Sequence, residues 1–268
     1  MLIKFRTQVS NIFNFLGKIH SYIFFVKFLL GMVIILMSWL GAGQDLGLAP
    51  KGNGNQIIGR AEYWLSYNEE HEQPDWVYYV LTKSEVYSKC ERTNDFREDP
   101  EVKTGSAMLE DYKYSGYDRG HLSPAADNKG NCPTSMSESF YMSNVSPMKP
   151  DFNRGIWGKL EYLVRGFALK FDEIYVVTGP VLIDSLIIDR IGPNQVSVPN
   201  YFYKVILDLK RECGIGFIME NEGAEGDLFK WAVSIDSVEV FTGLDFFPGL
   251  EDGLEERIEG AFKLIYWK

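Results

Sequence analysis

Hydrophobic and polar positions alternate in several stretches of the chain, and the period of the alternation predicts the local structure. Between Ile57 and Val86 the apolar positions, many of them aromatic, alternate with polar ones. This predicts two strands joined by a loop at residues 68–75. Between residues 153 and 171 the apolar positions instead recur at helical spacing, at Ile156, Leu160, Leu163, Val164, Phe167 and Ala168. This is the strongest helix signal in the sequence.

Short apolar runs predict further strands, whereas two segments show little periodicity. The strands cover residues 139–145, 173–181, 196–210 and 213–221, and a helical turn, a loop and a terminal helix follow in 238–260. Residues 90–102 and 105–116 are predicted to be loops. Strands therefore dominate, with two or three helices and hairpin-like connections. The pattern predicts an α+β fold with a central antiparallel sheet flanked by helices, and not a doubly wound parallel sheet.

The first 44 residues differ from the rest of the chain. They hold four basic residues and no acid, and an apolar run from Phe28 to Leu40 precedes the small residues 41–43. This order predicts a secretory signal peptide, cut near Gly43 or Gln44. The alternative is an uncleaved membrane anchor, because residues 22–42 are long enough to span a bilayer. Either reading predicts a location outside the cytoplasm, secreted or periplasmic, with membrane contact only if the segment is uncleaved.

The remaining chain is acidic. Residues 45–56 form a Gly-, Pro- and Asn-containing linker, and residues 57–268 are expected to form one domain. The whole chain carries a net charge of −10, and since residues 1–44 contribute four of its positive charges and no negative one, the remainder carries −14. Such a protein is not an obvious ligand for a polyanion, so phosphate binding would depend on a local cluster of cations.

The three cysteines leave two interpretations open. Cys90, Cys132 and Cys213 have no spacing that suggests zinc. Outside the cytoplasm Cys90 and Cys132 are the preferred pair for a single disulfide. Reduced, buried cysteines are an equally good interpretation.

Candidate catalytic residues gather in the stretch YSGYDRGHLSPAADNKG. His121 follows Asp118, Arg119 and Gly120 there, in a polar, irregular segment where it is not a core residue. A neutral imidazole is the commonest general base, and a nearby carboxylate can fix its tautomer. His71 lies in an acidic segment and is interpreted as exposed and without function.

A second polar group lies on the predicted helix. Asn153, Trp157, Glu161 and Arg165 are spaced four residues apart and form one stripe beside the apolar face. Glu161 and Arg165 are expected to form an ion pair across one helical turn. Simpler interpretations exist, because such a pair is often an ordinary surface pair and Asn153 suits a helix N-cap.

The segments YDRGHLSPAAD and SFYMSNVSPMKPDFNRGIWGKLE together closely resemble the DNA/RNA non-specific endonucleases, the ββα-metal family. The Asp-Arg-Gly-His box and the downstream Asn-x-x-x-Trp-x-x-x-Glu helix stand in the order and separation of that family. The resemblance covers nearly all of residues 57–268. It implies the ββα-metal fold, and an endonuclease that uses Mg²⁺, with Mn²⁺ as the alternative ion, to cleave DNA and RNA and leave 5′-phosphate ends.

The resemblance also implies roles for individual residues. His121 would be the general base, Asn153 the direct ligand of the metal, and Glu161 would hold metal-bound water. An upstream arginine is expected in ERTNDFRED, where Arg92 is preferred to Arg97. Contacts to phosphate, to the transition state or within the substrate site are implied for Arg119, Arg165, Asp118, Asn144 and Arg154.

The implied substrates are DNA and RNA, because contacts to phosphate position a nucleic acid without reading its sequence. Two alternatives stay open: a phosphodiesterase of small or lipid substrates on the same site, and a catalytically inactive surface binding protein. No stable protein partner can be inferred. The acidic charge predicts weak, salt-sensitive binding, unless one face collects the cations Arg92, Arg97, Lys113, Arg119, Lys149, Arg154, Lys159 and Arg165.

Overall fold

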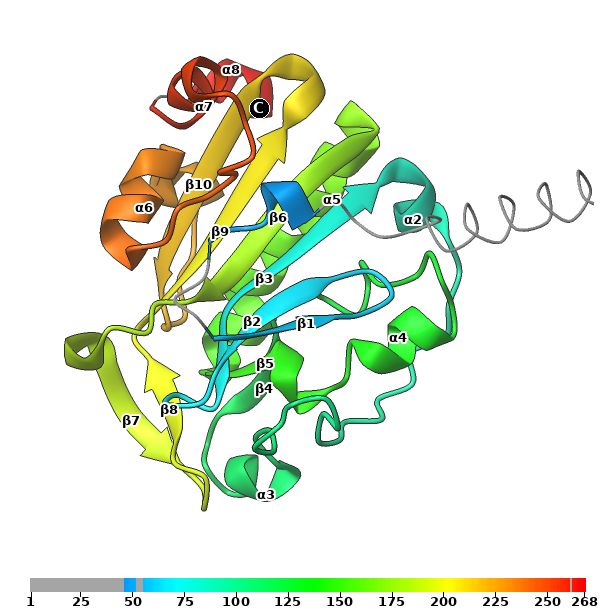
Figure 1. The fold of residues 1–268 in the computed structure, drawn as a ribbon, viewed down its shortest axis with the longest axis vertical. Coiled ribbons are helices and arrows are strands. Elements are labelled where there is room, and N and C mark those ends of the chain that lie inside the picture. Colours follow the sequence, from blue (N-terminus) through cyan, green and yellow to red (C-terminus); the bar gives the residue numbers. More distant parts are fainter. Residues whose placement is uncertain (1–45, 52–54, 261) are drawn as a thin grey trace, which may run out of the picture. The chain divides into compact units, whose positions relative to one another are not determined.

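A seven-stranded sheet forms the centre of the computed structural model, which describes residues 46–51, 55–260 and 262–268 (Figure 1). Every neighbouring pair of its strands is antiparallel. The strand order is β1 (Gln56–Gly59), β2 (Trp64–Asn68), β3 (Gln73–Thr82), β6 (Glu173–Pro180), β9 (Tyr201–Asp208), β10 (Cys213–Glu220) and β11 (Ala232–Val233). The α+β class with a central antiparallel sheet, predicted from the sequence, is confirmed.

Two small hairpins and several helices surround this sheet. Strand β4 (Asp118–His121) pairs with β5 (Val145–Met148), and β7 (Ile187–Ile191) pairs with β8 (Val196–Pro199). The helices are α2 (Lys83–Tyr87), α3 (Leu109–Tyr112), α4 (Thr134–Glu138), α5 (Gly158–Phe171), α6 (Ile235–Thr242), α7 (Asp252–Glu259) and α8 (Leu264–Trp267).

Helices cover both faces of the central sheet. Successive side chains of a strand point to opposite faces, and in β3 Val77 and Tyr79 belong to the core under α5, whereas Tyr78 belongs to the core under α6 and α7. Leu160 and Val164 of α5 are fully buried in the first of these cores. Burial on both faces explains why β6 and β9 read as nearly continuous apolar runs rather than as alternating ones.

The strongest predicted helix is present, but its first turn is wider than an α-helix. Residues Phe152–Trp157 form a π-helical turn that leads into α5, and Gly155 within it has non-helical dihedral angles (φ −97°, ψ −110°). The wide turn changes the relation between Asn153 and Glu161, which therefore do not follow the regular four-residue stripe. The predicted terminal helix is also present, as α7.

Three strand predictions need correction. Residues 57–86 form three strands and not two, because the chain reverses after β1, where Arg60 N donates to Tyr63 O at 2.8 Å. Residues 139–145 contain a helical turn at Met142–Asn144, and the strand begins only at Val145. The single strand expected over 196–210 divides into β8 and β9 at Asn200.

The loop after α2 is joined to the loop before α4 by a disulfide. The structure pairs Cys90 with Cys132, whose Cα atoms lie 6.0 Å apart, as the sequence analysis preferred. Cys213 is buried and free, and burial raises the pKa of its thiol to about 11. Part of the expected linker also packs against the domain, since Leu48 and Ala49 are buried in the core under α6. The predicted signal peptide or anchor lies outside the described residues.

Candidate active site

Strand β4 and the start of the α5 segment meet through side-chain hydrogen bonds. The carboxylate of Asp118 accepts hydrogen bonds from Asn153 Nδ2 at 2.9 Å and from Arg154 Nε at 2.7 Å. Burial alone would raise the pKa of Asp118, but these hydrogen bonds outweigh burial and lower it. An ionised carboxylate engaged in this way is suited to orient Asn153 and Arg154. It is not suited to the direct contact with substrate phosphate that the sequence suggested.

His121, at the end of β4, packs against two phenylalanine rings that also contact each other. Its ring centroid lies 5.2 Å from that of Phe96 and 4.9 Å from that of Phe140. Within the part of the chain that the structure describes, its Nε2 is buried and has no hydrogen-bond partner. Burial, and then the charges of Arg92 and Arg119, lower the pKa of His121 to about 3. The imidazole is therefore neutral at neutral pH.

Close packing of β4 on β5 fixes the position of this histidine. His121 is paired with Val145 across the two strands, and Gly120 is paired with Ser146. A Cβ atom on Gly120 would collide with the side chain of Met148, so the approach of the strands requires glycine here.

Two arginines flank His121 by stacking on the same phenylalanine rings. The guanidinium of Arg119 lies 4.3 Å from the Phe96 ring centroid, and that of Arg92 lies 4.8 Å from the Phe140 ring centroid. Both arginines are exposed. Arg97 instead stacks on Tyr141 at 4.0 Å and hydrogen-bonds to Asp95. The structure thus places Arg92, rather than Arg97, beside the histidine.

Asn144 is fully enclosed behind the site. Its side chain donates to the carbonyl oxygens of Ser123 and Ser139 at 2.9 and 2.8 Å, and its Oδ1 accepts from Ser123 N at 2.8 Å. Since Asn144 is completely buried, it holds the loop after β4 in place. The expectation that it contacts substrate needs correction for this reason.

The carboxylate of Glu161 on α5 lies among charged side chains. Burial is the main cause that raises its pKa to about 7, because burial and the charge of Asp127 together outweigh the opposing charges of Lys204, Arg165 and Arg92. The predicted ion pair between Glu161 and Arg165 is wrong. Arg165 Nη1 instead donates to Asp127 Oδ1 at 2.9 Å, because the buried Asp127 requires a cation and the loop after β4 brings it to α5.

Two buried charges at this site were not predicted from the sequence. Asp127 also accepts a hydrogen bond from Tyr79 Oη at 3.1 Å. Lys204 of β9 is completely buried, its Nζ lies 4.9 Å from the Trp157 ring centroid, and burial lowers its pKa to about 8. The sequence carried a signal for each of these two residues. Asp127 stands in the histidine-containing stretch, and Lys204 is the single cation in the apolar run of β9.

His71 was interpreted as exposed, and this interpretation is wrong. The residue is only 4% exposed, and its Nδ1 lies 2.9 Å from Ser197 Oγ of β8. Burial lowers its pKa. The turn between β2 and β3 folds against β8, which the acidic sequence around His71 did not indicate.

An open pocket borders β4 on the exposed side of the site. Its lining includes Lys113, Tyr117, Asp118 and Arg119. Two of the cations that the sequence analysis grouped therefore share one pocket. Lys149 lines a neighbouring pocket that also contains Tyr117, and its ammonium is paired with Glu222.

Oxygen ligands suited to a hard divalent cation are present beside the histidine strand. The Nδ2 of Asn153 faces Asp118, and no described residue donates a hydrogen bond to its Oδ1. An amide oxygen that receives no hydrogen bond suits Mg²⁺, which takes few protein oxygens and keeps several waters. The residues therefore fit such an ion.

Comparisons with known proteins agree on one family. A sequence model described as DNA/RNA non-specific endonuclease matches residues 48–253. The mitochondrial nuclease EXOG of Danio rerio is 36% identical over 204 residues, which are 70% of this chain and 59% of that protein. The mitochondrial nuclease of Saccharomyces cerevisiae is 32% identical over 71% of this chain and 65% of its own length. The chain thus spans about three fifths of these two relatives.

A solved structure gives the same result. A chain in the crystal structure of the EndoG/EndoGI complex aligns with a TM-score of 0.69 and 30% identity, over 74% of this chain and 87% of that one. The similarity supports the ββα-metal arrangement of β4, β5 and α5.

The predicted location outside the cytoplasm needs correction. The zebrafish and yeast relatives are mitochondrial nucleases, which contradicts a secreted or periplasmic assignment made from the N-terminal pattern. Among the described residues, no helix is both long and apolar enough to cross a membrane.

Proposed function

Because the chain belongs to the DNA/RNA non-specific endonuclease family, we propose that it hydrolyses phosphodiester bonds of DNA and RNA at the site around His121. One observation carries the proposal: the hydrogen bond from Asn153 to Asp118 joins the proposed metal ligand to the strand that ends in the proposed base. This hydrogen bond supports the proposal that the two groups act on one phosphate.

His121 takes a proton from the attacking water in this proposal. The enclosed Nε2 cannot meet water, so we assign the proton acceptor to Nδ1. A positioned general base contributes about 10²–10⁴-fold to the rate. Burial, and then the charges of the two flanking arginines, lower the pKa of this base in the free protein. A bound phosphate offsets their charge, and we expect it to raise the pKa of His121 towards the working pH.

The proposed metal site consists of the Asn153 amide oxygen, with Glu161 holding metal-bound water. Mg²⁺, or Mn²⁺ in its place, supplies Lewis-acid stabilisation of the charge that develops on phosphate and leaving oxygen. A neutral amide ligand does not reduce the charge of the ion. Asp118 keeps the amide of Asn153 in orientation, and the carboxylate of Glu161 is set in place among Lys204, Arg165 and Arg92.

Substrate binding is proposed to depend on phosphate contacts. Arg92 and Arg119 are exposed on either side of His121 and offer planar, bidentate donors. Such contacts fix position and carry no sequence information, which agrees with cleavage of both DNA and RNA. Since the chain as a whole is acidic, binding rests on this local group and falls as salt is added.

The test is digestion of plasmid, RNA and a small phosphodiester, side by side, by the full chain with Mg²⁺. We expect the two polymers to be cleaved, chelator to stop cleavage, and His121→Ala to reduce the rate at least a hundredfold while the protein stays folded. His71→Ala removes the other described imidazole and should retain cleavage. If His121→Ala digests plasmid as fast as the parent, the assignment of the base is wrong, and preference for the small diester would favour a phosphodiesterase.

A further inference from the structure

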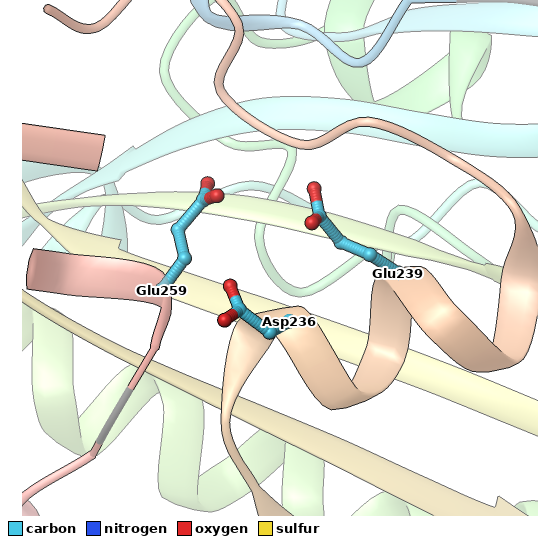
Figure 2. Close-up of side chains that lie close together, drawn as sticks. All are labelled: Asp236, Glu239 and Glu259. Carbon is cyan, nitrogen blue, oxygen red and sulfur yellow. The ribbon is translucent and has the colours of Figure 1, made fainter. Parts of the chain in front are cut away.

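Three carboxylates meet on the face of the sheet opposite α5. Asp236 and Glu239 come from the first two turns of α6, and Glu259 is the last residue of α7. One oxygen of each lies within 4.8 Å of an oxygen of the other two. Figure 2 shows the three side chains pointing towards one another from the two helices.

Glu259 is the buried member of this group. Its exposed fraction is 4%, and its Oε1 is buried with no hydrogen-bond partner among the residues that the structure describes. The side chain points towards Glu239 and Asp236 (Figure 2). A buried carboxylate oxygen without a donor is costly and rare in folded proteins, so this oxygen indicates a missing partner at the centre of the group.

The charged groups around Glu259 are negative and therefore destabilise its ionised carboxylate. Burial, followed by the charges of Glu239, Glu255, Asp236 and Asp245, raises its pKa to about 9. Every one of these neighbours is acidic. A group of this kind is stable only with a bound cation or with an added proton.

The nearby basic side chains are engaged elsewhere. Arg257, on the same helix, donates to Gly253 O at 2.6 Å and to Glu212 Oε2 at 3.4 Å. Lys51 pairs with Asp245 at 3.3 Å, and this pair is exposed. Neither cation bonds to the three carboxylates, so no side chain in the described part of the chain supplies the missing partner.

We propose that Asp236, Glu239 and Glu259 bind one Ca²⁺ ion that ties α6 to α7. The number of carboxylates favours Ca²⁺ over Mg²⁺. Mg²⁺ is usually held by one or two carboxylates and keeps several waters, whereas Ca²⁺ accepts about six to eight oxygen ligands in a flexible geometry. Glu239 has one oxygen engaged by Phe246 N at 2.8 Å and a second oxygen free for the ion. Asp236 is exposed, which leaves room for water ligands.

The ion would act on stability and not on catalysis. Ile235 and Ile258, beside Asp236 and Glu259, belong to the core under α6 and α7, whereas α5 and Trp157 belong to the core on the opposite face. A Ca²⁺ ion between the helices thus fastens the C-terminal layer to the sheet without contact with His121.

Thermal unfolding of the full chain, freed of metal by chelation, tests the proposal. We expect Ca²⁺ at a hundredfold excess over its Kd to raise Tm by about 5 °C or more, and Mg²⁺ to have a smaller effect at the same concentration. Glu259→Gln keeps the shape but removes the charge. It should raise the Tm of the metal-free protein and abolish the Ca²⁺ shift. Asp236→Asn, which changes the exposed ligand, should also abolish the rise in Tm with Ca²⁺. This variant replaces Glu259→Gln in the test if Glu259→Gln does not fold.

Two control variants separate this site from the rest of the molecule. Glu256→Gln removes an exposed carboxylate from the same helix and should keep the full Ca²⁺ shift. Asn153→Ala removes the proposed catalytic ligand and should also keep it, so failure of the nuclease proposal leaves this test intact. Absence of a Ca²⁺ shift in the parent would mean that Glu259 is neutralised by a proton. A shift that survives in Glu259→Gln would place the ion elsewhere. Either result overturns the proposal.

Discussion

The buried pair of Asp127 and Arg165 allows a quantitative test of how the site is held. Asp127→Asn keeps the shape of the side chain but removes its charge. The change weakens a charge-assisted hydrogen bond of 2.9 Å to Arg165 and alters the bond of 3.1 Å from Tyr79. A hydrogen bond to a charged group contributes about 1.5–3 kcal/mol, and breaking one side of a buried ion pair costs about 3–5 kcal/mol.

We expect a loss of about 3 kcal/mol in the free energy of unfolding, towards the lower end of the range for buried pairs. Two features moderate the loss: burial already raises the pKa of Asp127, and Glu161 remains near Arg165. For a domain of this size the loss corresponds to a fall of about 6–12 °C in Tm. Because Arg165 is then free to turn towards Glu161, we also expect kcat/KM on plasmid to fall at least about tenfold.

Denaturant unfolding and plasmid kinetics measure the two effects. The matched control is Asp95→Asn, which removes the carboxylate of a partly exposed pair with Arg97 at 2.8 Å. Exposed pairs contribute about 0–1 kcal/mol, so Asp95→Asn should lower the free energy of unfolding by no more than about 1 kcal/mol. Equal destabilisation by Asp127→Asn and Asp95→Asn would refute the reasoning, because burial would then not decide the strength of the pair.

Two further predictions concern stability. Burial raises the pKa of Glu62 to about 7, so the folded protein keeps a proton that the unfolded chain releases above pH 4.5. Stability should therefore fall by up to about 3 kcal/mol between pH 4.5 and 7, and Glu62→Gln should flatten this slope in denaturant titrations. If the pH dependence of stability is unchanged in Glu62→Gln, the raised pKa does not belong to Glu62. Reduction of the Cys90–Cys132 disulfide, 42 residues apart in sequence, should cost about 4 kcal/mol by loop entropy. The variant Cys213→Ser should lose the same amount of stability on reduction, because Cys213 is not part of the disulfide.

The sequence was informative where structure depends on local periodicity. The apolar spacing of Leu160, Val164 and Phe167 depends only on one face of a helix meeting a core, and α5 is present where it was predicted. The segment 139–145 was wrongly predicted as a strand because it is a short apolar run. Its Asn144 makes two hydrogen bonds to Ser123 in the loop after β4 and one to Ser139 O within the segment. The two bonds to the loop override the local β preference.

The pairing of charges could not be predicted for the same reason. On a helix, Arg165 is within reach of Glu161, and the sequence offers no means of knowing that Asp127 is closer. That choice depends on the path of the loop from His121 to α4, which carries little periodic signal. The neighbours of Lys204 depend on which strands lie beside β9. The spacing within the motifs thus predicted which residues gather, but not which partner each one takes.

Lys204 has one further consequence, for the alignment of the central sheet. It lies on the face of β9 that packs under α5, between Phe202 and Ile206, while Tyr203 and Val205 face the opposite core. Displacement of β9 by one residue would carry the ammonium into the apolar layer under α6 and leave two carboxylates without it. The interaction of Lys204 with Asp127 and Glu161 therefore disfavours a one-residue shift of β9, because the same shift would remove a cation from the proposed active site.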